Sequence, residues 1–292
     1  MKKKKLAIAL AVVCVVALLA VIGCGKWLCK EEKAVVQEKL VIGTDYHLPY
    51  FAFGEGEKTF ILLPGASMTS ILESEDGVQA LFAPYAEDYR IYVFDVPQEL
   101  GTVTGIGQLA DIVADASDAL GIESAEVYGA SMGGMIAQEL AIHHPELVHS
   151  LTLASSMSRN NALSTEVISG WAAISDPEEL ARDVNTHVYS PEYYGTYEEI
   201  FHSLEAAATT DGVDRLHNLA RMILDFSAYD ALDQIKCPVY VFTGSSDNTL
   251  GVAASTEIAE KLGCFIKVHE GYSHAVYDEF PGFYDEVFAN LK

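Results

Sequence analysis

Ser131 stands in the stretch EVYGASMGGMIAQ, where an apolar run leads into a serine flanked by glycines and then into a helix-like segment. Gly129 and Gly133 occupy positions at which a sharp strand-to-helix turn has no room for a side chain. Such a turn lifts the hydroxyl off the sheet and sets it at a helix N-terminus, whose dipole favours an oxyanion. A small residue in a plain turn is the alternative, but the place between a buried strand and a helix favours a nucleophile.

A serine nucleophile needs a base, and His274 in Glu270-Gly-Tyr-Ser-His274 is the best placed. It follows the last expected strand and precedes the last expected helix, which puts the imidazole over the carboxyl edge of a sheet. The other histidines fall in the N-terminal hairpin, at element ends, within a strand or in a helical insertion: His47, His143, His144, His149, His187, His202, His217 and His269.

An acid must orient that imidazole and stabilise its cation. Asp247, in FTGSSDN, comes just past an expected strand and gives the chain order Ser131, Asp247, His274, which is the order of hydrolases with a nucleophile elbow. Asp95, at the end of RIYVFDVP, is the alternative carboxylate and could instead shape a turn or reach the pocket.

The oxyanion formed by such a nucleophile needs two backbone donors. The N–H of Met132 directly follows the serine, and the N–H of Ala66, with Ser67 nearby, comes from the loop after KTFILLPG. Pro64 in that loop has no N–H and cannot donate. The sequence therefore predicts an oxyanion hole made of two main-chain amides.

Alternating strands and helices must position these residues. Short apolar runs typical of buried strands occur in KTFILLPG, RIYVFDVP, AEVYGAS, LVHSLTLASS, CPVYVFTG and FIKVHEG, after an expected hairpin in KLVIGTDYH and PYFAFGE. Between and after them, helices are expected that include residues 71–86, 251–262 and 276–291. The pattern predicts an α/β fold with a mostly parallel sheet covered by helices on both faces.

The alternation is interrupted by residues 156–235, which are helix-like throughout, with stops at Asp176-Pro177 and Ser190-Pro191. Such a segment is too long for a structureless loop and predicts a helical cap. It divides a core of residues 39–155 and 236–292, and we expect it over the crevice at the carboxyl ends of the strands.

The cap sequence is rich in aromatic and acidic residues. Its aromatic side chains could line an apolar acyl site or form the cap's own core: Trp171, Tyr189, Tyr193, Tyr194, Tyr197, Phe201, Phe226 and Tyr229. Residues 156–229 hold 12 acidic and 4 basic side chains, which could attract an amine-bearing substrate such as a peptide N-terminus or simply solvate the surface.

The first 25 residues form a separate segment. Four lysines precede an uncharged stretch from Leu6 to Gly25, as in an export signal, and residues 26–38 are expected to form a linker. The residues before Cys24 resemble a bacterial lipoprotein signal, which implies cleavage there and a lipid on the thiol. An uncleaved membrane helix is the alternative. Both place the remaining chain on the outer face of the bacterial cytoplasmic membrane, tethered by this segment alone.

The remaining chain is strongly acidic, with 10 basic and 39 acidic side chains in residues 40–292. Such a charge repels phosphate backbones and anionic head groups, which argues against a nucleic-acid partner, and it is typical of a surface kept soluble by charge. Cys237 and Cys264 each precede an expected strand and could be two buried thiols or, in an exported chain, a disulfide. No pair of cysteines has metal-ligand spacing.

With Ser131 in GASMGG, Asp247 in FTGSSDN, His274 in GYSHAV and the LLPGAS loop, the chain from about residue 40 to 292 resembles an α/β-hydrolase with a helical cap. The resemblance implies an eight-stranded sheet, a Ser–His–Asp triad and water as the acceptor, with no metal or organic cofactor. The chain differs from many members of that family at two places. It has Pro64-Gly65 where they have His-Gly, and it has Ser273 where they have a glycine before the base. Families with an aspartate nucleophile are disfavoured because residue 131 is serine.

The function predicted on this basis is hydrolysis of a carboxylic ester, or a related small acyl compound, through an acyl-enzyme. The GASMGG elbow looks closer to esterases than to aminopeptidases, in which tryptophan commonly follows the serine. A serine peptidase, a C–C bond hydrolase, a transferase or lyase, and a binding module that has lost catalysis are the alternatives.

Overall fold

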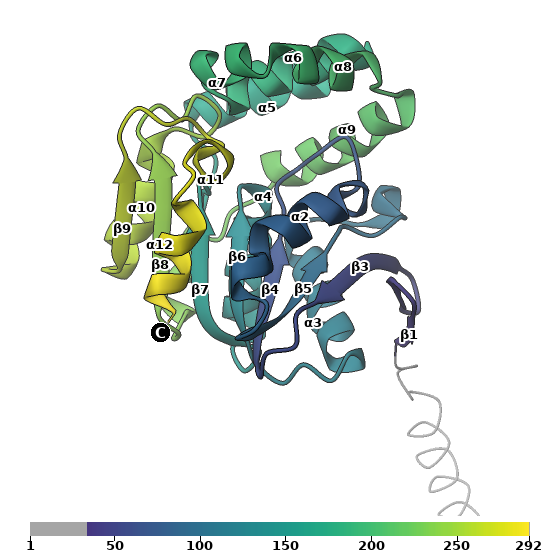
Figure 1. The fold of residues 1–292 in the computed structure, drawn as a ribbon, viewed down its shortest axis with the longest axis vertical. Helices are drawn as coiled ribbons and strands as arrows, with labels where there is room; N and C mark the ends of the chain where they lie inside the picture. The colour runs from purple at the N-terminus through teal and green to yellow at the C-terminus, as the bar shows by residue number, and fades with distance from the viewer. Residues whose placement is uncertain (1–33, 292) are drawn as a thin grey trace, which may run out of the picture. The chain divides into compact units, whose positions relative to one another are not determined.

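The computed structural model describes residues 34–291, in which nine strands form one sheet in the order β1-β2-β3-β5-β4-β6-β7-β8-β9 (Figure 1). The strands are β1 (Val35–Gln37), β2 (Leu40–Ile42), β3 (His47–Phe53), β4 (Lys58–Leu63), β5 (Tyr89–Phe94), β6 (Ala125–Ala130), β7 (Val148–Ala154), β8 (Val239–Gly244) and β9 (Phe265–His269). Strands β4 to β9 pair in parallel, and β1, β2 and β3 pair antiparallel. The mostly parallel sheet predicted from the sequence is confirmed.

The predicted number of eight strands is wrong, because β1 forms within the segment expected to be a linker. Its three residues pair with β2 from Val35 opposite Ile42 to Gln37 opposite Leu40. All three are exposed, so the strand buries no face and shows no hydrophobic alternation in the sequence. The predicted export signal and Cys24 lie outside the described residues, and within residues 34–291 no helix has the length and apolar character that crossing a membrane requires.

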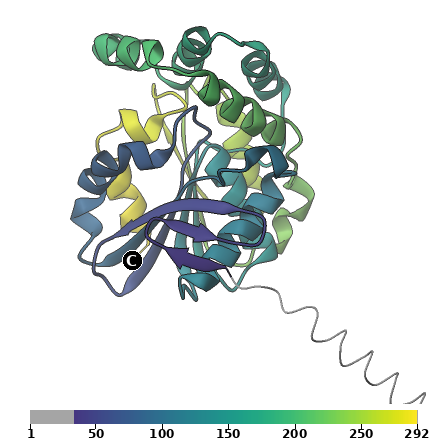
Figure 2. The same cartoon turned by 90° about the vertical axis from the view of Figure 1, so that its right-hand side faces the viewer.

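Both faces of the sheet are covered, as the alternation of side chains along β4 illustrates. Phe60 and Leu62 pack on one face with α2 (Glu75–Phe82) and α12 (Phe283–Asn290). Ile61 and Leu63 pack on the other with α3 (Ile106–Ala119), α4 (Met132–His143) and α10 (Val252–Leu262). Figure 2 shows the two helical layers on either side of the sheet.

Two expected helices are shorter than predicted. Residues 71–86 form a 3₁₀ turn η1 (Ile71–Ser74), then α2, then a second turn η2 (Ala83–Tyr85). The C-terminal helix is divided into α11 (Val276–Glu279) and α12, because Pro281 lacks an amide donor and holds Phe280 in an extended conformation. A further 3₁₀ turn, η3 (Leu100–Thr102), follows β5.

The segment between β7 and β8 consists of helices, which we call the cap: α5 (Ala162–Ala173), α6 (Pro177–Val188), α7 (Pro191–Thr196), α8 (Glu198–Ala206), α9 (Thr210–Leu224) and the turn η4 (Tyr229–Gln234). The sequence stops at Asp176-Pro177 and Ser190-Pro191 are helix starts, in which the Asp or Ser side chain accepts a backbone hydrogen bond and proline is the first helical residue. Figure 1 shows α5 to α8 as a layer beyond one end of the sheet.

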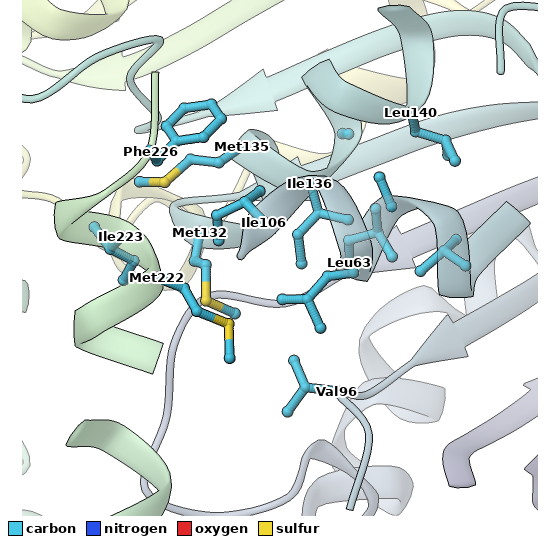
Figure 3. Close-up of a cluster of buried hydrophobic side chains, with 14 of the residues drawn as sticks. Leu63, Val96, Ile106, Met132, Met135, Ile136, Leu140, Met222, Ile223 and Phe226 are labelled. Carbon is cyan, nitrogen blue, oxygen red and sulfur yellow. The ribbon is translucent and has the colours of Figure 1, made fainter. Parts of the chain in front are cut away.

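Helix α9 fastens the cap to the core. Its Met222 and Ile223, with Phe226 just beyond, belong to the same buried cluster as Met132 and Met135 of α4 (Figure 3). These apolar contacts lie directly behind the start of α4. The cap is therefore packed against the turn that carries Ser131.

Candidate active site

The predicted site residues follow the ends of parallel strands, so all of them lie at one edge of the sheet. Ser131 follows β6, Asp247 follows β8 and His274 follows β9. The loop with Ala66 follows β4, whose Leu63 is paired with Gly129 at the end of β6. Neighbouring strands thus bring together residues that are more than 200 positions apart.

Ser131 occupies the strained turn that the sequence predicted. Its φ of 52° and ψ of −117° lie where a residue with a side chain is rarely found. The turn is held by hydrogen bonds from Ser131 N to Ala154 O, at 2.8 Å, and from Gly134 N to Ser131 O, at 3.0 Å. Helix α4 starts at the next residue, so its free N-terminal amides lie beside the hydroxyl.

The glycines around Ser131 are required by close packing of one backbone on another. A Cβ on Gly129 would lie 2.3 Å from Gly133 O, and one on Gly133 would lie 2.0 Å from Leu63 O. A Cβ on Gly65 would lie 3.2 Å from the Cβ of Ser131. The loop that was predicted to supply the second oxyanion donor therefore lies against Ser131.

Asp247 and His274 form a buried pair. Nδ1 of His274 lies 2.9 Å from Oδ2 of Asp247, and the two side chains are almost fully excluded from solvent. The other oxygen of Asp247 accepts the amides of Thr249 and Leu250 at 2.9 Å each. Burial raises the pKa of Asp247, but the charge of His274, its hydrogen bond and these two amides together hold the pKa below its ordinary value. The carboxylate is thus kept ionised beside the imidazole.

A cavity of about 880 Å³ lies between the cap and the edge of the sheet. Ser131, His274 and Ala66 all line it, whereas the Met132 side chain is buried behind them. The structure therefore brings the proposed nucleophile, base and oxyanion loop to one cavity, with the N–H of Met132 at the first position of α4.

Asp95, the alternative acid, has a different partner. Its Oδ1 lies 2.5 Å from Nη2 of Arg215 on α9, and its Oδ2 accepts a hydrogen bond from Ser70. Arg215 also donates from Nε to Ser67 O at 3.1 Å. This partly buried ion pair joins the cap to the core and to the loop that carries Ala66.

Ser273, where many relatives have glycine, bonds to the cap. Its hydroxyl lies 2.7 Å from Val188 O and 2.6 Å from Oε1 of Glu279. Ala275 N donates to the same Val188 carbonyl at 3.0 Å. The end of α6 is thus bonded to the loop that carries His274.

The same helix end is also bonded to the loop that carries Asp247. Thr249 Oγ1 donates to His187 O at 3.0 Å, and Thr249 N donates to Asp247. Two adjacent carbonyls of α6 are therefore bonded to the two loops that carry Asp247 and His274.

Two contributors to the site were not singled out from the sequence. A Cβ on Gly244 would lie 2.2 Å from Ser273 O, so only glycine lets the base loop pack on the end of β8. Glu279 bonds to Ser273 and to Ser190 N. The glycine could have been noticed from its place between the strand CPVYVFTG and Asp247, whereas nothing in the sequence marks Glu279.

The cap aromatics are divided between the lining of the cavity and the interior of the protein. Trp171 and Tyr189 line the cavity, while Phe201 is buried and stacks with Tyr194 at 4.8 Å between ring centroids. Phe226 is part of the buried cluster on α4. The cap therefore has an aromatic core of its own and an aromatic wall.

Cys237 and Cys264 are free thiols. Burial raises the pKa of Cys237 to about 11, and it raises the pKa of Cys264 as well. Both thiols are thereby kept protonated at neutral pH, which suits a structural role.

A model of the α/β-hydrolase fold family matches residues 58–281. A candidate carbamate hydrolase, RutD, from Azorhizobium caulinodans is 29% identical over 162 residues, and the match covers 54% of this chain but 61% of the relative. The 3-oxoadipate enol-lactonase 2 of Acinetobacter baylyi is 22% identical over 75% of this chain and 82% of its own length. The chain thus spans about three fifths of the first relative and more of the second.

Solved structures show the same fold at lower identity. MGS-M2, an α/β hydrolase from a Medee basin deep-sea metagenome library, superposes with a TM-score of 0.76 at 16% identity, over 85% of this chain and 94% of that one. The esterase EaEST from Exiguobacterium antarcticum gives a TM-score of 0.74 at 17% identity, over 87% and 99% of the two chains.

Proposed function

The chain belongs to the α/β-hydrolase family, and from that premise we propose that it is a serine hydrolase that cleaves carboxylic esters through Ser131, Asp247 and His274. One observation carries the proposal: a serine in a strained turn lines the same cavity as an imidazole that is bonded to a buried carboxylate. A serine in an ordinary turn would require neither the strained backbone, nor the shared cavity, nor the bonded imidazole and carboxylate.

The reaction begins when Nε2 of His274 takes the hydroxyl proton of Ser131 and Oγ forms a bond to the acyl carbon. Asp247 keeps the imidazole oriented through Nδ1 and stabilises its positive charge. The carbon–oxygen bond to the leaving group then breaks, and the alcohol leaves with the proton from His274. Water repeats the sequence on the acyl-enzyme, which releases the acid and restores Ser131.

The negative charge on the carbonyl oxygen needs donors aimed at it from fixed positions. The Met132 amide begins α4, and the loop with Ala66 is held against Ser131 by the close approach at Gly65. Removal of one such donor from a hydrolase typically slows the reaction by roughly 10²–10³-fold. The two amides are therefore the main stabilisers of the tetrahedral intermediate.

An ester is the favoured substrate class. Two similar proteins are named as an enol-lactonase and an esterase, and both names denote cleavage of a carbon–oxygen acyl bond. The cavity wall includes apolar side chains such as Ile168, Trp171 and Leu250, which suit the carbon chain of an acyl group. Export and a membrane tether through residues 1–25, with Cys24 lipidated, remain predictions from the sequence.

The test is hydrolysis of p-nitrophenyl esters from acetate to palmitate by the full chain and by Ser131→Ala. We expect turnover with an optimum of chain length, and loss of at least roughly 10³-fold in kcat for the variant. Ser203→Ala, at an exposed position of α8, is the matched control and should retain full activity.

Labelling by a fluorophosphonate separates an inactive protein from a selective one. Its phosphorus–fluorine bond breaks only when an activated serine attacks. Labelling at Ser131 without ester turnover would redirect the proposal to amide or C–C substrates. Absence of both would refute it in favour of a binding module.

A further inference from the structure

A second groove, of about 420 Å³, adjoins the cavity that holds Ser131. The two share four lining residues, Leu81, Tyr189, Tyr277 and Asp278, so a ligand can extend from one into the other. The groove runs between α7 and α8 of the cap and the segment from α11 to α12. A substrate whose acyl carbon is at Ser131 could therefore place another part of itself in this groove.

Aromatic rings dominate the walls of the groove. Five tyrosines line it: Tyr189, Tyr193, Tyr197, Tyr277 and Tyr284. Tyr189 stacks on Tyr193 at 5.4 Å, and Tyr193 packs against Tyr197 at 4.8 Å, so the rings form a continuous wall. The faces of aromatic rings carry partial negative charge and attract cations within about 6 Å.

Asp278 is the one charged side chain among the described residues that line this groove. One of its oxygens accepts a hydrogen bond from Tyr189 Oη at 3.0 Å, and within residues 34–291 no lysine, arginine or histidine forms an ion pair with it. The carboxylate is exposed, and it faces the groove and the cavity, both of which it lines.

The surroundings of Asp278 add no positive charge. The next residue is Glu279, and Tyr189 and Tyr277 are the nearest polar rings. Enclosure by protein raises the pKa of Asp278 to about 6, so at neutral pH it remains mainly an anion without a countercharge. Ionisable groups that line a pocket and have a shifted pKa concentrate at functional sites.

We propose that the aromatic groove binds an alkylammonium group of the substrate, held between the Asp278 carboxylate and the faces of the tyrosine rings. The identity of the bond that is cleaved rests on the function proposed above, but the affinity for the cation does not. An uncharged apolar group in the groove would displace water from the carboxylate and would offer no hydrogen bond or charge in its place. An anionic group would be repelled by Asp278, and no cation of the groove lining would offset this.

Two esters of the same shape test the inference. Butyrylcholine and 3,3-dimethylbutyl butyrate differ only in the replacement of the quaternary nitrogen by carbon. For the full-length chain we expect kcat/KM to favour the cationic ester by about tenfold or more. The preference should fall to near one in Asp278→Asn, in which the amide still accepts the bond from Tyr189. Asp285→Asn changes an exposed carboxylate of α12 outside the groove and should keep the wild-type preference.

Tyr193→Leu removes one ring of the wall and provides a second variant should Asp278→Asn fail to fold. It should reduce the preference several-fold while the carboxylate remains. A wild-type ratio of one or below, with both esters cleaved, would overturn the inference and leave the proposed function in place.

Binding of tetramethylammonium to Ser131→Ala, measured by calorimetry, needs no turnover. We expect saturable binding that weakens about tenfold or more when Asp278→Asn is added. Such binding without cleavage of either ester would support the cation site and count against the ester hydrolase. Failure of tetramethylammonium to bind, or binding that does not depend on Asp278, would contradict the inference.

Discussion

The two ends of the cavity are built in different ways. At the end that holds Ser131, the core supplies the residues, and Asp247 and His274 are 5% and 2% exposed. At the end that holds Asp278 the cavity adjoins the aromatic groove, whose cap wall includes Tyr197 and Ile200, which are 43% and 57% exposed. The end that holds Ser131 is built from close contacts between backbone segments. The cap wall at the other end includes exposed side chains, which are packed by fewer neighbouring residues.

This difference separates the requirements of chemistry from those of recognition. A Cβ at several positions near Ser131 would overlap main-chain atoms, so that end tolerates little change. The exposed tyrosine and isoleucine of α7 and α8 could be replaced without disturbing a packed core. The end with the proposed catalytic residues is thus determined by the fold, whereas the aromatic end tolerates changes of side chain.

Asp247→Asn should produce the largest effect, a loss of kcat. It tests whether Asp247 is the group that orients His274. In the variant the side-chain oxygen stays with the amides of Thr249 and Leu250, so its NH2 group faces Nδ1 of His274. A donor there favours the wrong tautomer of the imidazole, so kcat should fall by about 10³–10⁴-fold. Steady-state kinetics with a p-nitrophenyl ester measure this. A loss below tenfold would mean that another group orients the base.

Gly133→Ala should destabilise the core end strongly. Its Cβ would lie 2.0 Å from Leu63 O, where only backbone can give way, and we expect a loss of roughly 3 kcal/mol. Gly170→Ala in cap helix α5 is the matched control, because nothing lies within 4 Å of the added carbon. Alanine there should stabilise the protein by about 0.5–1 kcal/mol. Urea unfolding gives both values, and equal effects would remove the contrast between core and cap.

Arg215→Met tests the ion pair that joins the two regions. It leaves the carboxylate of Asp95, which is 5% exposed, without its charged partner, and should cost about 2–3 kcal/mol. Addition of Asp95→Asn should recover much of this loss.

The control for this ion pair is Arg159→Met, which breaks an exposed pair with Glu257. That pair is worth less than about 1 kcal/mol. Denaturation curves that show the same loss for both arginines would mean that burial of Asp95 contributes nothing.

Asp278→Asn should have a small effect on stability, opposite in sign to the effects of Gly133→Ala and Arg215→Met. The pKa of Asp278 is raised from 3.8 to about 6 in the folded protein, so the folded state binds this proton more tightly than the unfolded chain does. The contribution of Asp278 to the free energy of unfolding is fully present below its pKa in the unfolded chain, 3.8. This contribution is lost as the pH rises through about 6, the pKa in the folded protein.

Asparagine cannot ionise, and the variant should therefore be more stable by about 1 kcal/mol at pH 8, after allowance for the solvent exposure of the carboxylate. The titratable groups that interact with Asp278 include Tyr189, Tyr193, Tyr277, Glu279 and Tyr284, and all of these are unchanged in the variant. Thermal unfolding at pH 8 and pH 4 measures the difference. An equal gain at both values would assign it to packing instead of charge.

Much of the catalytic end could be predicted from the sequence because its signals are local. Ser131, Asp247 and His274 each follow an apolar run that predicts a buried strand, and parallel strands end at one edge of the sheet. The strained turn at Ser131 was likewise indicated by its flanking glycines.

Features that depend on contacts between distant segments could not be predicted in this way. The ion pair between Asp95 and Arg215 joins residues 120 positions apart. No sequence motif around either residue indicates this pairing. Strand β1 could not be predicted from the sequence because all three of its residues are exposed, so it has no hydrophobic pattern. The division of the cap aromatics between core and wall depends on which helices pack together, which their composition does not specify.

The hydrogen bonds at the end of α6 give the cap a mechanical role. The adjacent carbonyls of His187 and Val188 accept from Thr249 and Ala275, and these belong to the loops that carry the acid and the base. Rotation of α6 away from the core would pull on both loops at once. Any displacement of α6 from the core would therefore also displace Asp247 and His274 from each other, which couples the position of the cap to the geometry of this pair.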